Sequence, residues 1–269
     1  MKVREAANGR LEHAFRRARD QGRLALVTYL TAGYPSLEAT LDLVPALVRA
    51  GADVIELGVP FSDPIADGPI IQRAAYEALQ QGVTPQDCLR VAECLRKGGL
   101  EVPLLFMGYY NPILAWGPAA YARACREAGA DGLIVPDLPL EEAEELDGAC
   151  QGQSLALIYL VAPGTPATRL ARIARKARGF LYLVSRAGIT GPRDSLPAGL
   201  PEYVARVRRH CDLPLALGFG IGEPVQVREL HGLVDAAVVG SAIVERAVQG
   251  AEAVERFARG LAEAAKGCA

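Results

Sequence analysis

The sequence predicts an α/β protein of the (β/α)8 barrel type, formed by a single domain that spans residues 1–269. Eight short apolar runs alternate with segments of helical periodicity, and such alternation implies parallel strands covered by helices. No linker or change in composition divides the chain. An open, doubly wound sheet is the alternative, and the count of eight strands favours the barrel.

The apolar runs predict strands near residues 24–31, 53–58, 103–108, 132–136, 155–161, 179–184, 214–218 and 236–240. Helical patterns between them cover residues 36–51, 117–129, 165–179 and 201–211, among others. Ser36 is expected to cap the first of these helices, and Gly51 and Gly129 stand where helices should end. The amphipathic segment 4–22 precedes the first strand, and we expect it to form an additional N-terminal helix that closes the bottom of the barrel.

The composition excludes several classes of protein. Hydrophobic residues make up 51% and charged residues 22% of the chain, which excludes disorder. A net charge of −2 suggests neither a nucleic-acid partner nor a membrane surface, and no apolar run reaches the ~18 residues that span a bilayer. The six cysteines form no C-x-x-C pair and the start lacks an apolar signal segment, so free thiols and a cytoplasmic location are expected. We expect solvated helix faces for Arg16, Arg17, Arg206, Arg208 and Arg209.

Candidate catalytic carboxylates follow the second predicted strand, in the segment DVIELGVPFSDPIADG over residues 53–68. Alternation turns Glu56 into the barrel interior, where burial should raise its pKa and suit it to donate and accept protons. A glutamate satisfied by a neighbouring arginine or hydroxyl is the alternative. Asp63 is expected to be a turn or helix-cap residue, whereas Asp67 can be aimed at a ligand from the barrel mouth.

Two glycine-rich segments coincide with the place where (β/α)8 barrels often bind phosphate. LGFGIG over residues 217–222 follows the seventh strand, and VGSAIV over residues 239–244 turns the eighth strand into a short helix. Glycine lets backbone N–H groups approach an anion, and a helix N-terminus adds a favourable dipole. The polar segment 185–197 is either a mobile lid or an ordinary loop, and Thr190 and Gly191 would contact the phosphate if it closed.

The positions of the lysines and histidines argue against several reaction mechanisms. The four lysines lie in terminal or predicted helical segments, which argues against a Schiff-base aldolase or lysine-bound pyridoxal phosphate. The three histidines also lie on predicted helices, which argues against the usual metal cluster of a zinc aldolase or metal-dependent epimerase. The mechanism that these arguments leave is acid–base catalysis by carboxylates on a phosphorylated substrate.

Six segments between about residue 11 and about residue 250 resemble a known family: ELGVPFSDPIADGP, MGYYNP, LIVPDLP, LYLVSRAGITG, GFGI and VGSAIV. They are similar, in the same order, to the α subunit of tryptophan synthase. The resemblance implies retro-aldol cleavage of indole-3-glycerol phosphate to indole and glyceraldehyde 3-phosphate, with no cofactor in this subunit. It also implies a β-subunit partner that holds pyridoxal phosphate and takes the indole directly, within an α2β2 heterotetramer.

The alternatives left open are an indole-releasing lyase that works without a β subunit, another phosphosugar barrel enzyme, and a catalytically silent subunit that activates a partner. The histidine and lysine positions disfavour the second. The presence of both catalytic carboxylates disfavours the third.

The resemblance also assigns roles to positions of this sequence. The acid–base glutamate of the family falls on Glu56, the carboxylate that holds the indole N–H falls on Asp67, and the site tyrosine falls on Tyr182. The other substrate- and phosphate-binding positions fall on Tyr29, Tyr109, Ile134, Thr190, Gly191, Phe219, Gly220, Gly240 and Ser241. Asn111 and Pro112 are expected in a loop that faces the β subunit. Tyr29 stands where some members have phenylalanine, so its hydroxyl needs a partner or a water molecule.

Overall fold

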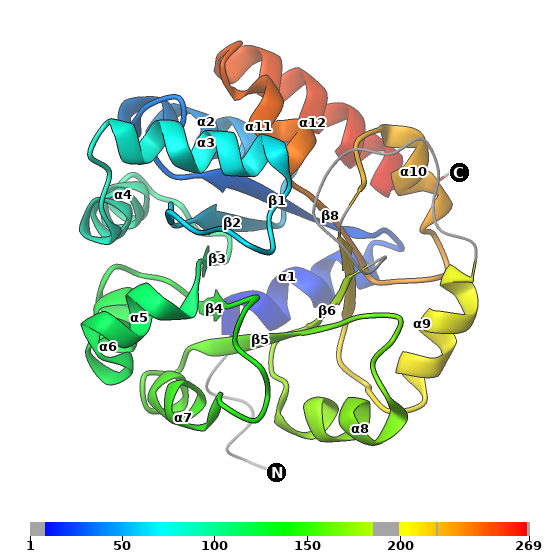
Figure 1. Ribbon diagram of the computed structural model, residues 1–269. Helices are drawn as coiled ribbons and strands as arrows, with labels where there is room; N and C mark the ends of the chain where they lie inside the picture. The colour runs from blue at the N-terminus through cyan, green and yellow to red at the C-terminus, as the bar shows by residue number, and fades with distance from the viewer. Residues whose placement is uncertain (1–8, 185–198, 219, 268–269) are drawn as a thin grey trace.

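Eight parallel strands close into a barrel in chain order, as Figure 1 shows for the computed structural model, which describes residues 9–184, 199–218 and 220–267. The strands are β1 (Ala25–Thr31), β2 (Val54–Gly58), β3 (Leu104–Met107), β4 (Gly132–Ile134), β5 (Ala156–Val161), β6 (Leu181–Val184), β7 (Leu215–Gly218) and β8 (Ala236–Val239). Pairing of β8 with β1 completes the closure. The predicted (β/α)8 barrel is confirmed, and no strand end differs from its predicted position by more than two residues.

The helices include one, α1, that lies across the amino-terminal end of the barrel, and the others form a ring around it (Figure 1). They are α1 (Gly9–Asp20), α2 (Leu37–Ala50), α3 (Pro69–Gln80), α4 (Pro85–Lys97), α5 (Tyr110–Trp116), α6 (Pro118–Glu127), α7 (Glu144–Gly152), α8 (Ala167–Lys176), α9 (Leu200–Arg208), α10 (Pro224–Glu229), α11 (Ser241–Ala247) and α12 (Ala251–Ala265). As predicted, the Ser36 side chain caps α2 by accepting the Ala39 N–H at 3.0 Å, and Gly51 ends this helix with φ 110°. None of the described helices is long and apolar enough to cross a membrane.

Helix α1 covers the amino-terminal end of the barrel, as the amphipathic segment 4–22 predicted. In Figure 1 it lies across the centre of the ring, behind the strands. Leu11 and Phe15 are buried on its inner face, and the Phe15 ring centre lies 5.3 Å from that of Phe180, just before β6. The first eight residues lie outside the described part of the chain.

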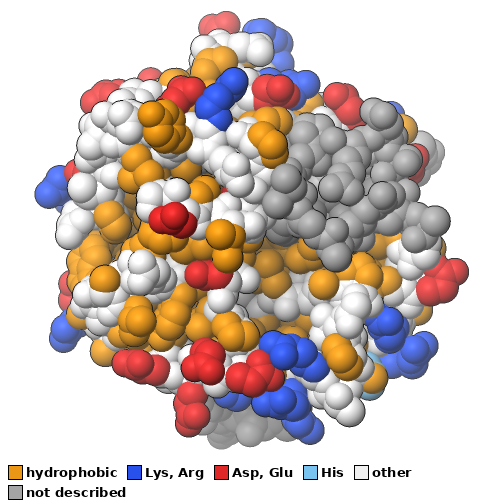
Figure 2. All heavy atoms as spheres, in the orientation of Figure 1, with side chains coloured by type: hydrophobic (Ala, Val, Ile, Leu, Met, Phe, Trp, Pro, Cys, Tyr) orange, Lys and Arg blue, Asp and Glu red, His pale blue; other side chains and the backbone are white. Residues whose placement is uncertain are grey.

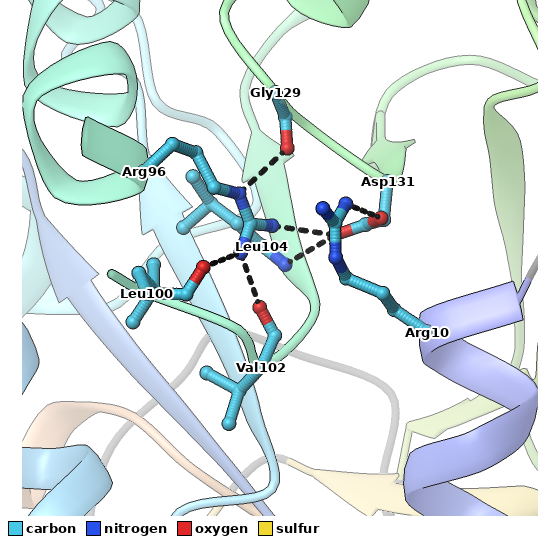
Figure 3. Close-up of polar contacts among 7 residues, drawn as sticks. All are labelled: Arg10, Arg96, Leu100, Val102, Leu104, Gly129 and Asp131. Carbon is cyan, nitrogen blue, oxygen red and sulfur yellow. Dashed lines mark hydrogen bonds and ion pairs between the residues drawn. The ribbon is translucent and has the colours of Figure 1, made fainter. Parts of the chain in front are cut away.

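At the amino-terminal end of the barrel, Asp131 joins the start of β4 to the start of β3 by hydrogen bonds (Figure 3). Its carboxylate accepts the Leu104 N–H at 2.9 Å, and its own N–H donates to the Leu104 carbonyl at 2.8 Å. The guanidinium groups of Arg96 and Arg10 donate to the same carboxylate at 2.7 and 3.0 Å. Arg96 also donates to the backbone carbonyls of Gly129, Leu100 and Val102.

Asp53 and Asp235 make the same reciprocal contact before β2 and β8, and we call these three residues with Asp131 the aspartate clamps. The Asp53 carboxylate accepts the Leu26 N–H at 2.9 Å, and the Asp235 carboxylate accepts the Leu215 N–H at 2.6 Å. Their N–H groups donate to the carbonyls of the same two leucines at 2.8 and 2.9 Å. Each clamp therefore joins an even-numbered strand to the strand before it.

Three of the arginines expected on solvated helix faces bind other parts of the fold. Arg17 donates to Asp53 at 2.8 Å, and Arg208 forms an ion pair with Asp235. Arg206 donates to the Pro163 carbonyl. Arg17 remains exposed while it binds Asp53. For Arg206 and Arg208, which are half-buried, the prediction of a solvated face is wrong, because periodicity shows only that a helix has a polar face and not what closure of the barrel brings against it.

Candidate active site

Glu56 lies inside the barrel, on β2, opposite Tyr29 of β1 and Leu105 of β3. Its side chain is 1% exposed, and neither carboxylate oxygen has a hydrogen-bond partner among the described residues. The arginine or hydroxyl partner considered as an alternative is therefore absent from that part of the chain. Burial raises the pKa of Glu56 to about 8, so the carboxyl group holds a proton at neutral pH.

Two buried tyrosines, Tyr29 of β1 and Tyr182 of β6, line the same cavity as this glutamate. Glycines make room for their hydroxyl groups: a Cβ at Gly58 would overlap the Tyr29 hydroxyl, and one at Gly218 would overlap the Tyr182 hydroxyl. The partner that the Tyr29 hydroxyl needs is Thr31, whose Oγ1 lies 3.3 Å away. Sequence reasoning missed this role of Thr31, although alternation puts both residues on one face of β1.

Asp67 is the second buried carboxylate, in the loop that follows β2, and it is 5% exposed. Its Oδ2 accepts the Tyr109 hydroxyl at 2.8 Å, whereas its Oδ1 has no partner among the described residues. Burial raises the pKa of Asp67 to about 6, against the opposing effect of the Tyr109 hydrogen bond. The group is therefore mostly ionised at neutral pH, while Glu56 is mostly protonated.

Asp63 was expected to be a turn or helix-cap residue, and the structure places it in a turn rather than at the N-cap of α3. The N-cap of α3 is Gly68, which has no side chain of its own to cap the helix. Asp63 does occupy a turn, in which its carbonyl accepts the Ile65 N–H at 2.9 Å and its carboxylate accepts the Ser62 hydroxyl at 2.5 Å. The Asp67 carboxylate does not cap α3 but binds the Tyr109 hydroxyl through Oδ2. Its Oδ1 therefore remains available to accept a hydrogen bond from a ligand.

Residues of the glycine-rich segments after β7 and β8 line the cavity that contains Glu56. Gly220, Gly240 and Ser241 line the same cavity as Glu56, Tyr29 and Tyr182. The empty volume there is about 420 Å³, open solvent included. Gly220 has φ 101°, which favours glycine, and a Cβ at Gly240 would lie 3.3 Å from the Tyr29 Cβ.

The remaining predicted positions are placed as follows. Ile134 is buried at the end of β4, in register with Met107, which lines the cavity. Asn111 and Pro112, expected in a loop, lie in helix α5. The predictions for Thr190, Gly191, Phe219 and the segment 185–197 fall outside the described residues.

A larger hollow lies at the other end of the barrel, between α1, α2 and α4, with an empty volume of about 1780 Å³. Its polar lining includes Arg10, Arg17 and Asp53, which already bind one another or a clamp. We assign the site to the smaller cavity because it holds a buried carboxylate without a partner. It also lies near the carboxyl ends of the strands, where barrel enzymes carry their active sites. Figure 2 looks onto this end and shows apolar side chains gathered at the centre, with charged side chains concentrated towards the rim.

Comparisons with known proteins identify the family of the chain. The family model "Tryptophan synthase alpha chain" matches residues 15–268. The tryptophan synthase alpha chain of Chloroflexus aggregans is 51% identical over 240 residues, which cover 88% of this chain and 89% of that one. The corresponding chain of Roseiflexus castenholzii is 52% identical over 235 residues, which cover 87% and 90%.

Solved structures give the same result. A structure of Mycobacterium tuberculosis tryptophan synthase superposes with a TM-score of 0.90 at 38% identity, covering 96% of this chain and 98% of that one. The tryptophan synthase alpha chain of Legionella pneumophila superposes with a TM-score of 0.87 at 35% identity, covering 96% and 97%. The chain therefore belongs to the tryptophan synthase alpha chain family, the lyases that cleave indole-3-glycerol phosphate in tryptophan biosynthesis.

Proposed function

We propose that Glu56 is the acid and base of this cleavage. At neutral pH its carboxyl group is protonated and donates that proton to indole C3. The carboxylate so formed then accepts the proton of the side-chain hydroxyl next to C3. As the C–C bond breaks, its electron pair returns to the indole ring, and the carbon that bore the hydroxyl becomes the aldehyde of glyceraldehyde 3-phosphate. The proton taken up restores the acid form.

Asp67 acts on the ring nitrogen. Its free Oδ1 is the acceptor for the indole N–H, and its negative charge favours the cationic ring formed when C3 is protonated. The observation that carries the proposal is this pair of buried carboxylates, whose pKa values of about 8 and about 6 lie on opposite sides of neutrality. An acid and an anion are then present together.

Substrate binding is divided between two sides of the cavity. Gly220, Gly240 and Ser241 receive the phosphate through the backbone at the ends of β7 and β8. The indole ring lies toward Tyr29, Tyr109 and Ile134, and Tyr182 packs beside the reacting carbons. Thr190, Gly191 and Phe219 complete the phosphate side in this proposal.

The α-chain family carries no cofactor of its own, since pyridoxal phosphate belongs to the β chain. We expect this chain to assemble with a β subunit as α2β2, and to pass indole to it rather than release it. A cytoplasmic location fits the free thiols of the five described cysteines, four of which are buried. We expect low turnover by the chain alone and activation by the β subunit.

The test is the pH dependence of kcat/KM for indole-3-glycerol phosphate. We expect a bell with an acid limb near pH 6 from Asp67 and an alkaline limb near pH 8 from Glu56. Glu56→Gln is expected to lower kcat about 10²–10⁴-fold. Wild-type turnover in this variant, or a profile that is flat between pH 5 and 9, would contradict the assignment.

A further inference from the structure

Tyr109 connects Asp67 to a second loop of the barrel mouth. It follows β3, and its hydroxyl donates to Asp67 Oδ2 at 2.8 Å while accepting the Ala66 N–H at 3.0 Å. Its ring stacks on Phe61, with ring centres 5.4 Å apart. Tyr109 therefore determines both the path of the loop after β2 and the orientation of the Asp67 carboxylate.

Asp137 binds the backbone of Tyr110, the residue that follows Tyr109. It lies in the loop after β4, and its Oδ1 and Oδ2 accept the Tyr110 N–H at 3.0 and 3.2 Å. Tyr110 is the first residue of α5, whose N-cap, Tyr109, makes no side-chain cap hydrogen bond. The cap is supplied instead by a carboxylate from the neighbouring loop, one residue away from the tyrosine that binds Asp67.

We propose that Asp137 is a positioning residue for the lyase reaction: by fixing the first turn of α5 it holds the Tyr109 hydroxyl on Asp67, so that the other oxygen of Asp67 faces the indole N–H. The inference rests on the role proposed above for Asp67. Asp137 lies in the LIVPDLP segment, where the local pattern alone predicts no role for it.

A consequence is that Asp137 influences the ionisation of Asp67. A hydroxyl that donates to a carboxylate stabilises its charged form, so loss of the Tyr109 contact raises the pKa of Asp67. Burial raises the pKa of Tyr109 itself, and the charges of Asp67 and Asp137 add to the effect, which keeps the phenol a donor. Among the described residues, the other titratable groups whose pKa responds to Asp67 are the phenols of Tyr29 and Tyr182.

The experiment compares Asp137→Ala, Asp137→Asn and Tyr109→Phe in the full chain. Asp137→Ala is expected to lower kcat about 10-fold with a change in KM below about 3-fold, and to move the acid limb of kcat upward by about half a pH unit to one unit. Asp137→Asn keeps an oxygen that accepts the Tyr110 N–H and should recover most of kcat. Tyr109→Phe should move the acid limb of kcat upward at least as far as Asp137→Ala does. In the double variant, Asp137→Ala should add little to the shift that Tyr109→Phe causes.

Asp87→Ala is the matched control, because Asp87 also caps a helix, accepting the Thr84 N–H at 2.9 Å at the start of α4. It should lower the Tm without moving the acid limb. If Asp137→Ala behaves as this control does, or if its shift is fully additive with that of Tyr109→Phe, Asp137 is a structural cap only and the proposal is overturned.

A second readout separates this proposal from the role of Asp67 in catalysis. The ionisation of Asp67 is followed by the ¹³C NMR shift of its carboxyl carbon, assigned by its loss in Asp67→Asn. A midpoint that rises in Asp137→Ala supports the positioning role even if Asp67→Asn keeps full turnover, a result that would refute only the catalytic role of Asp67. An unchanged midpoint overturns the role of Asp137.

Discussion

Replacement of Glu56 by glutamine is expected to make the folded chain more stable, by an amount that grows with pH. Glu56 is buried without a partner among the described residues, and burial raises its pKa from 4.5 to about 8. Between these values the folded chain holds a proton that the unfolded chain has lost. The free energy of unfolding then falls by about 1.4 kcal/mol per pH unit, or roughly 4–5 kcal/mol in total. This contribution is fully present below about pH 4.5 and is lost as the pH rises through 8.

Glutamine has the shape of the protonated carboxyl group and no charge at any of these pH values, so the variant escapes the loss. The assay is urea unfolding of both proteins at pH 5.5, 7 and 8, since two-state curves give the free energy of unfolding by linear extrapolation. The advantage of Glu56→Gln over the wild type should grow by about 3 kcal/mol between pH 5.5 and pH 8. Glu101→Gln, at an exposed glutamate, should give a constant difference.

Parallel stability curves for the wild type and Glu56→Gln would refute the reasoning. They would mean that the carboxylate is solvated or paired in the folded chain, and that its proton is not retained by burial. The alkaline limb expected in the pH profile would lose its explanation as well, because one ionisation underlies both measurements.

Asp67→Asn is expected to lower kcat about 10²–10⁴-fold with a smaller effect on the affinity for indole, measured by steady-state kinetics and indole titration; unchanged kcat would make Asp67 a loop residue only. Gly58→Ala should lower the free energy of unfolding by about 1–3 kcal/mol, because the new Cβ overlaps the Tyr29 hydroxyl. Gly164→Ala, at a glycine with open space around it, is the control, and equal losses in urea unfolding would contradict the overlap. Asp131→Ala should cost about 3–5 kcal/mol, because two guanidinium groups and a backbone N–H lose their shared acceptor; a loss below 1 kcal/mol would show that water replaces the carboxylate.

Local patterns predicted the fold and the inward position of Glu56, the first of the two candidate catalytic carboxylates. The strand positions followed from apolar runs, because each strand of a parallel barrel is buried on both faces. Alternation along β2 was enough to predict that Glu56 points inward, which its burial and its place in the cavity lining confirm.

Contacts between distant segments were not predictable in the same way. Asp67 was expected to act at the barrel mouth, but its partner Tyr109 lies 42 positions away, and Arg17 lies 36 positions from Asp53. No periodicity within one helix or loop encodes such a distance. Asp137 was overlooked for the same reason, since its contact is with the helix of a neighbouring unit.

The aspartate clamps divide the amino-terminal end of the barrel into units that can open separately. They join β1 to β2, β3 to β4 and β7 to β8, whereas Phe180 stands before β6 in place of the aspartate. Native-state hydrogen exchange should therefore proceed strand pair by strand pair, with the amides of Leu26, Leu104 and Leu215 among the slowest. The pair β5–β6 should open at the lowest free energy of the four. That pair carries Tyr182, so the strand pair expected to open most easily forms one wall of the candidate active site.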